Sequence, residues 1–127
     1  MTDLSSIFDD VIETDIPVKP PVALLHELGQ ELEKKTQGLL TFSVIKGRRH
    51  ETFLFDFRIF VPSLNNYSYD VFSVEHGFAL YPLKISFNNN TIDIVNEEIL
   101  VETFKAIFAD PKIKRVINGL LAQAKYS

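Results

Sequence analysis

The three histidines are the first residues to test for chemistry, because an imidazole binds metal ions and moves protons near neutral pH. They stand at positions 26, 50 and 76, too far apart for the short spacings that bring two imidazoles to one metal ion. His26-Glu27 would open an HExxH helix motif, but Gln30 stands where the second histidine belongs. We therefore expect no metal site, and we interpret His26, His50 and His76 as structural or surface residues.

Other patterns of catalytic residues are also missing from the sequence. The chain has no cysteine, which excludes thiolate nucleophiles and thiolate metal sites, and no serine lies in a G-x-S-x-G turn. The one basic cluster is Lys46-Gly47-Arg48-Arg49-His50, whose single glycine does not make a phosphate-binding loop. Such a cluster is typical of a solvated turn, although it also suits an acidic partner such as the N-terminal segment. We predict no catalytic residue and no cofactor, so a binding protein is favoured over an enzyme.

Composition and charge restrict the class of protein. A chain of 127 residues with 46% hydrophobic residues predicts one domain, and eleven Phe without Trp predict a core of phenyl rings. The net charge is −4, because residues 1–18 carry five acids and no base while residues 19–127 carry twelve acids and thirteen bases. Without a dense basic stripe we expect no nucleic-acid partner. Such a partner would have to use Arg48, Arg49, Lys112, Lys114 and Arg115.

We also expect a cytoplasmic protein that has no membrane partner. The first residues lack the basic start and the apolar run of a signal peptide, and no apolar stretch approaches the roughly 20 residues that cross a bilayer. The lack of cysteine agrees with a reducing compartment.

Residues 1–20 are predicted to form an acidic arm and a Pro-rich linker, followed by a single domain at residues 21–127. Apolar residues of the arm recur at the spacing of a short amphipathic helix. A helix of about a dozen residues needs a surface to stabilise it, either its own domain or another protein. The prolines of the linker restrict its backbone and stiffen it. The apolar stripe of the arm consists of Leu4, Ile7, Phe8, Val11 and Ile12.

The strongest pattern in the chain is the strand expected at residues 52–61. Every second residue there is a phenylalanine or a β-branched residue, which gives one continuous apolar face. The other face carries Leu54, Asp56, Arg58 and Phe60, and its two ends are too apolar for an edge strand. We predict that this strand lies inside a sheet. Its second face is either a solvated surface with an ion pair or an exposed binding face.

The remaining segments predict helices on either side of a run of strands. One helix begins at Pro21 and ends near Gly38, and two more begin at the capping residues Asn96 and Asp110. Pro82 lacks a backbone donor, so it places the fourth strand at an edge or makes it irregular. The fold class is therefore α+β: an antiparallel meander sheet of four to five strands, with one N-terminal and two C-terminal helices packed on one face. The strands are expected at 39–46, 52–61, 67–75, 78–87 and 91–95, with a turn at 47–50.

The run from Pro21 to Leu40, together with His76-Gly77 and Leu80-Tyr81-Pro82, resembles small bacterial proteins of unassigned role, and this resemblance implies no site. The small acidic α+β plan is similar in architecture to secretion chaperones and to bacterial immunity proteins.

We therefore predict a non-enzymatic protein of the bacterial cytoplasm, a homodimer that binds another protein in a chaperone-like, immunity-like or adaptor role. The sheet face or the N-terminal arm would make the contact. The alternative is a small-molecule-binding protein or enzyme with a pocket between sheet and helices, using His76, Tyr81 or Glu75 as polar groups. The candidate contact residues of the first interpretation are Leu54, Asp56, Phe60, Arg48, Arg49, Leu4, Ile7, Phe8 and Val11.

Overall fold

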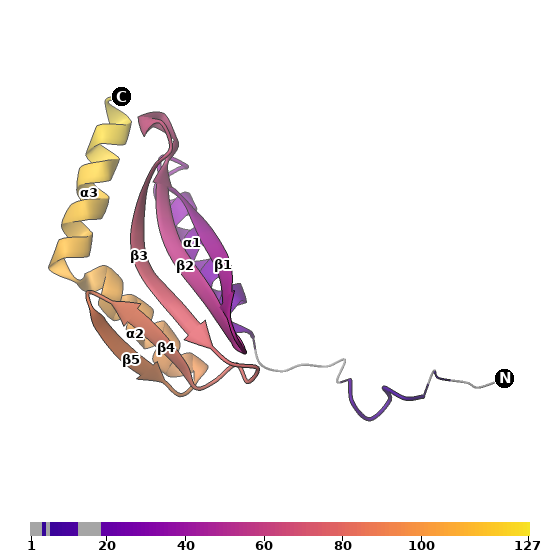
Figure 1. Cartoon of the computed structure of the whole chain (residues 1–127). Helices are drawn as coiled ribbons and strands as arrows, with labels where there is room; N and C mark the ends of the chain where they lie inside the picture. The colour runs from indigo at the N-terminus through magenta and orange to yellow at the C-terminus, as the bar shows by residue number, and fades with distance from the viewer. Residues whose placement is uncertain (1–3, 5, 13–18) are drawn as a thin grey trace.

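The computed structural model describes residues 4, 6–12 and 19–127. Residues 19–127 form a helix, five strands and two further helices, with a short 3-10 helix after the second strand (Figure 1). This order confirms the predicted α+β class. The elements are α1 (Pro21–Lys35), β1 (Thr41–Arg49), β2 (Thr52–Val61), η1 (Pro62–Leu64), β3 (Tyr67–His76), β4 (Leu83–Phe87), β5 (Asn90–Ile94), α2 (Glu97–Ala109) and α3 (Pro111–Lys125).

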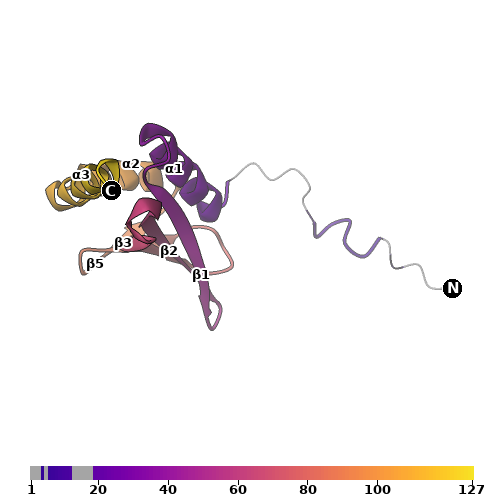
Figure 2. The same ribbon diagram turned by 90° about the horizontal axis from the view of Figure 1, so that it is seen from above.

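The strands form one antiparallel meander in the order β1-β2-β3-β4-β5. Strand β2 pairs with β1 on one side and β3 on the other, so its predicted place inside the sheet is confirmed. Helices α1, α2 and α3 lie on the same side of the sheet (Figure 2). We call the opposite side, which none of these three helices covers, the open face.

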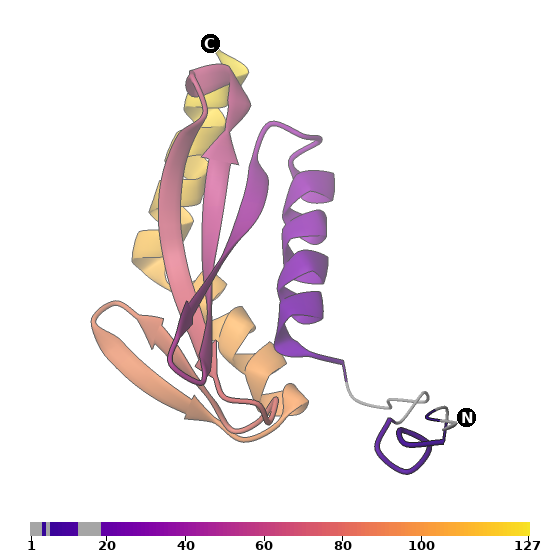
Figure 3. The same cartoon turned by 45° about the vertical axis from the view of Figure 1, so that its right-hand side comes forward.

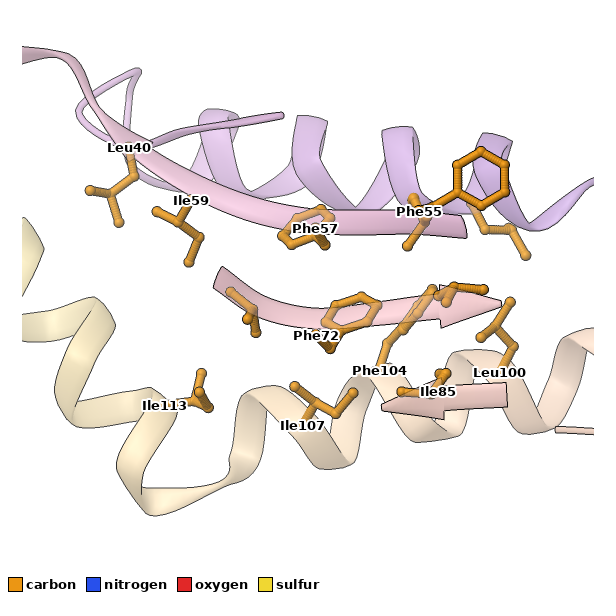
Figure 4. Packing of buried hydrophobic residues seen from close by; sticks show 14 of the residues in the cluster. Leu40, Phe55, Phe57, Ile59, Phe72, Ile85, Leu100, Phe104, Ile107 and Ile113 are labelled. Atoms are coloured by element: carbon orange, nitrogen blue, oxygen red, sulfur yellow. The ribbon is translucent and has the colours of Figure 1, made fainter. Parts of the chain in front are cut away.

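The core fills the space between the three helices and the covered face of the sheet. The alternate apolar residues of β2 point into it, as the sequence predicts. The Phe57 ring is fully buried between the rings of Phe42 and Phe72, at centroid distances of 5.9 and 5.3 Å. Helix α2 adds Phe104, whose ring centroid lies 5.5 Å from that of Phe72 (Figure 4). The buried residues of β2 are Phe55, Phe57, Ile59 and Val61.

Strand pairing between β2 and β3 contains a bulge. Phe57 pairs with Phe72, whereas the next residue, Arg58, pairs with Asp70. Val71 is therefore the extra residue on β3, and it is buried together with its neighbour Phe72. A bulge re-aims the side chains on one side of it, and here it sets Asp70 opposite Arg58.

The predicted turn at residues 47–50 is wrong. Strand β1 continues through Arg49, and the turn consists of His50 and Glu51, with His50 at φ 56°. Arg48 and Arg49 are strand residues that pair with β2. A two-residue connection fixes the register of a hairpin, and Gly47 pairs with Leu54 without a shift in that register.

Strand β4 is shorter than predicted and is not at an edge. It begins at Leu83, and it lies between β3 and β5. Pro82 precedes the strand, so it takes no place in the ladder. The asparagine turn after β4 is confirmed, because Asn88 and Asn89 have φ of 53° and 63° between paired strands.

The predicted caps of the two C-terminal helices are confirmed. Asn96 Oδ1 accepts a hydrogen bond from the Ile99 N–H at 2.9 Å. Asp110 Oδ2 accepts from the N–H groups of Lys112 and Ile113 at 3.1 and 3.3 Å. Each side chain satisfies donors that the first helical turn leaves unpaired.

The N-terminal arm does not form the predicted helix. Residues 6–11 make consecutive turns, in which the Ile7 N–H donates to the Leu4 carbonyl at 3.2 Å and the Ile12 N–H to the Phe8 carbonyl at 2.9 Å. The apolar residues of the arm are exposed, so among the described residues no surface stabilises a helix of this length. Most of the predicted linker, residues 13–18, lies outside the described residues.

No helix within the described ranges combines the length and the apolar character required to cross a bilayer.

Candidate functional site

The open face of the sheet is hollowed where β1 to β4 lie side by side. One depression of about 430 Å³ has a mixed apolar, charged and hydroxyl lining. A second depression, of about 450 Å³, shares Asp56, Ser73 and Ser86 with the first and continues to the asparagine turn after β4. The predicted contact residues Arg49, Leu54 and Asp56 therefore meet at one place. The first depression is lined by residues that include Ile45, Arg49, Leu54, Asp56, Ser73 and Glu75.

Arg58 joins two carboxylates on the open face. Its Nε lies 2.6 Å from Asp70 Oδ1, and its Nη2 lies 4.0 Å from Asp56 Oδ2. The contact between Nε and Asp70 Oδ1 is an ion pair that lacks the geometry of a hydrogen bond. The side chains of Asp56 and Asp70 are 45% and 69% exposed, which screens both pairs and leaves them a small share in stability. The two pairs place one positive and two negative groups beside the depressions.

The remaining predicted contact residues lie away from these depressions. Phe60 is half-buried on the open face and pairs with Thr41 and Ser68, at the other end of β2. Arg48 is exposed on β1, one position before Arg49, and so faces the opposite side of the strand. The other four belong to the arm, where all of them are exposed. They are Leu4, Ile7, Phe8 and Val11.

The three polar residues of the alternative prediction do not line one pocket. His76 is buried, stacks on Phe55 at a centroid distance of 5.6 Å, and donates from Nδ1 to the Gly77 carbonyl at 2.7 Å. Glu75 precedes it on β3, so it faces the opposite side of the sheet and lines the open-face depression. Tyr81 lies in the loop before β4.

Tyr81 carries a buried hydroxyl that has no hydrogen-bond partner among the described residues. Burial raises the pKa of this phenol above its ordinary value of 10.0, and the negative charge of Glu97 raises it further. Replacing Tyr81 with Phe removes the unsatisfied oxygen, so we expect the free energy of unfolding to stay level or to rise by up to about 1 kcal/mol. Chemical denaturation at pH 8 measures this difference.

The same residue predicts a dependence on alkaline pH. Because the folded pKa is raised, the unfolded chain loses the Tyr81 proton first, and the stability from this group is lost as pH rises above 10. The wild-type chain should therefore lose more stability than Tyr81→Phe on going from pH 8 to alkaline pH. Tyr126→Phe is the control, since Tyr126 is 90% exposed. Equal losses in all three proteins would contradict the assignment.

The other histidines do not assemble a metal site. His26 is exposed on α1, where its ring is edge-on to Phe42 at 5.8 Å, and His50 lies in the β1–β2 turn. In the ranges that the structure covers, no three His, Cys, Asp or Glu side chains are grouped so that they could hold a metal ion.

A further surface, which the sequence did not reveal, is a groove between α1 and α2. We call it the interhelical groove; its volume is about 400 Å³. Helix α1 packs chiefly on β1, while α2 packs on α3 and β5, and this division leaves the groove between them. Its apolar residues recur at the three- and four-residue spacing of an ordinary buried helical stripe. The groove is lined by Leu24, Leu28, Val101, Phe104 and Phe108, with Glu27, Glu31 and Lys105 at its rim.

The open face, the arm and the interhelical groove are thus the candidate contact surfaces of the described residues. Comparisons of the chain with protein-family models, with curated proteins and with solved structures gave no match.

Proposed function

We propose that this chain is a non-enzymatic protein-binding module of the bacterial cytoplasm, chaperone-like, immunity-like or adaptor-like in role. It contacts its partner through the open face of the sheet or through the N-terminal arm. The cytoplasmic setting is suggested by the cysteine-free composition.

The exposure of the arm is the observation that carries this proposal. Each of its five apolar side chains, Leu4, Ile7, Phe8, Val11 and Ile12, is between 54% and 70% exposed. Apolar side chains gathered on one short segment are unfavourable in water, and such clusters typically mark a protein or membrane contact. An amphipathic segment that folds against a groove is a common mode of protein recognition.

The open face supports the proposal with a different kind of contact. Ile45 and Leu54 bring apolar surface to the centre of the depression, and Arg49, Asp56 and Glu75 surround them with both signs of charge. An apolar centre with a charged border is the usual anatomy of a protein interface, in which the charges select the partner and its orientation.

Capture of partners from the native host tests the proposal. Affinity capture with the wild-type chain, with Leu54→Ser/Phe60→Ser and with Phe8→Ser/Val11→Ser should recover a protein that at least one double variant loses. Binding of that purified protein should weaken by at least about tenfold in the deficient variant, because apolar interface residues of this kind carry much of the binding energy.

Tyr126→Ser is the matched control, since it removes an aromatic side chain that is 90% exposed on the last turn of the chain. It should capture the same protein as the wild type. Circular dichroism must show that every variant is folded. If Leu54→Ser/Phe60→Ser unfolds, these residues belong to the core, and if the wild-type chain captures nothing that either variant loses, the proposed function is wrong.

A further inference from the structure

The interhelical groove is an apolar surface that reaches down to the aromatic core. Phe104 and Phe108 form part of its lining, and their rings contact Phe72 at centroid distances of 5.5 and 6.5 Å. Leu28 and Val101 line the two sides of the groove from α1 and α2. A narrow apolar groove between two helices suits the apolar stripe of a third helix, which would pack against both of them.

The arm of this chain carries a stripe of that kind. Its apolar residues stand at positions 4, 7, 8, 11 and 12, the i, i+3, i+4, i+7 and i+8 spacing that puts side chains on one side of a helix. Asp9 and Asp10 fall on the opposite side and stay in water in such an arrangement. The hydrogen bonds already formed in the arm span three and four residues, so continuing them into a helix needs little rearrangement.

The lengths of the arm and the groove agree. Residues 4–12 span roughly 12 Å as a helix at about 1.5 Å per residue. The groove is lined from Leu24 to Glu31 on α1 and from Val101 to Phe108 on α2. Each of these stretches rises by roughly 10 Å. An arm helix therefore covers the groove along its length and leaves little of its own stripe exposed.

The arm of one chain does not occupy the groove of that chain, since the apolar residues of the arm are between 54% and 70% exposed. Pro20, the residue before α1, is extended, with φ −67° and ψ 150°. Lys19 is held beside α1 by an ion pair with Glu27, at 3.0 Å between Nζ and Oε1. The chain reaches α1 at the lower end of this helix in Figure 3.

We propose that the interhelical groove binds the arm of a second copy of this chain, so that two chains exchange arms in a symmetric dimer. Every chain carries one arm and one groove, so reciprocal exchange covers both apolar surfaces of both chains and closes the assembly at two. The inference rests on the proposed function, because it identifies one partner of the arm. It leaves the open face available to a different protein.

The mass of the purified chain in solution tests this dimer. Analytical ultracentrifugation at chain concentrations from about 1 to 200 μM should show a monomer–dimer equilibrium for the wild type. The double variant Phe8→Ser/Val11→Ser should raise the dissociation constant of the dimer at least about 100-fold. Asp9→Ser, on the other side of the arm, should leave the dimer unchanged. None of these substitutions lies in residues 21–127, so circular dichroism should show the same folded domain in all these proteins. A wild-type monomer throughout, or a dimer that ignores the arm, overturns the proposal.

Disulfide trapping shows which groove the arm enters, and the absence of native cysteine makes every disulfide an engineered one. Phe8→Cys in one chain and Leu28→Cys in another should give a covalent heterodimer when the two are mixed and oxidised with oxidised glutathione. Asp9→Cys paired with Leu28→Cys is the control and should give far less. In the double variant Phe8→Cys/Leu28→Cys, a bond within one chain overturns the proposal, because it puts the arm in its own groove.

These experiments use only the purified chain. A negative result in them can therefore be told apart from a negative result in the test of the proposed function. If the chain is monomeric but still captures another protein through the arm or the open face, the exchange of arms is wrong and the binding role stands.

Discussion

Replacing Phe57 with Ala should lower the free energy of unfolding by about 4 kcal/mol, within the range of about 3 to 5 kcal/mol observed for buried Phe. The Phe57 ring is fully buried, stacks on Phe42 and Phe72, and meets the edge of Phe108 at 6.2 Å. Its loss removes a large apolar side chain together with three aromatic contacts. The neighbouring rings come from β1, β3 and α2, so no single element can move to fill the cavity.

Urea denaturation followed by circular dichroism measures this loss. The matched control is Phe78→Ala, since Phe78 is 74% exposed in the loop between β3 and β4. The control should change the free energy of unfolding by less than about 0.5 kcal/mol. A loss below about 1 kcal/mol for Phe57→Ala would mean that the ring is not enclosed as described.

Replacing Gly29 with Ala should destabilise the protein by about 2 kcal/mol, although Ala is the better helix former by about 1 kcal/mol. A Cβ atom on Gly29 would overlap with the Cγ, Cδ1 and Cδ2 atoms of Phe42. The Phe42 ring cannot retreat freely, because Phe57 stacks on it and His26 lies against its edge. Helix α1 must then move away from β1, and overpacking of this kind costs about 1 to 3 kcal/mol or more.

Gly119→Ala is the same chemical change, but it should raise the free energy of unfolding instead of lowering it. Gly119 lies in the middle of α3 with nothing within 4 Å of an added Cβ, so the helix propensity of Ala acts alone. We expect a gain of up to about 1 kcal/mol there. Denaturation curves of the two variants, measured side by side, should therefore shift in opposite directions. Shifts of the same sign would contradict the close packing of α1 on β1.

The fold could be predicted where a pattern of residues has one physical interpretation. The alternation in 52–61 permits only a strand with one buried face, and the capping residues Asn96 and Asp110 mark where helices begin. The hairpin turn could not be placed, because Gly47 is typical of turns and its place within β1 follows from pairing with β2. The arm was expected to be a helix on spacing alone, but a helix of this length depends on a surface to pack against, and the apolar residues of the arm are exposed.

The candidate site was less accessible to sequence reasoning. Leu54 and Asp56 could be nominated because they share one side of a strand. Arg49 was nominated as part of a basic turn, and its place on β1 beside them follows from strand pairing. Asp70 was missed as the partner of Arg58, because the bulge at Val71 changes which β3 residue faces it. The interhelical groove was also missed, since it depends on the separation of two helices that lie far apart in the chain. Its lining residues have the same spacing as any buried helical stripe.

The positions of the charged residues on the outermost strands bear on whether two copies of the sheet can pair edge to edge. The sheet ends at β1 and β5, whose outer backbone groups are open to pairing with another chain. On β1 this border carries Lys46, Arg48 and Arg49, and an identical border approaching it would bring like charges together. Strand β5 is only five residues long and includes Asp93. The basic residues of β1 are thus expected to oppose edge-to-edge pairing of identical sheets.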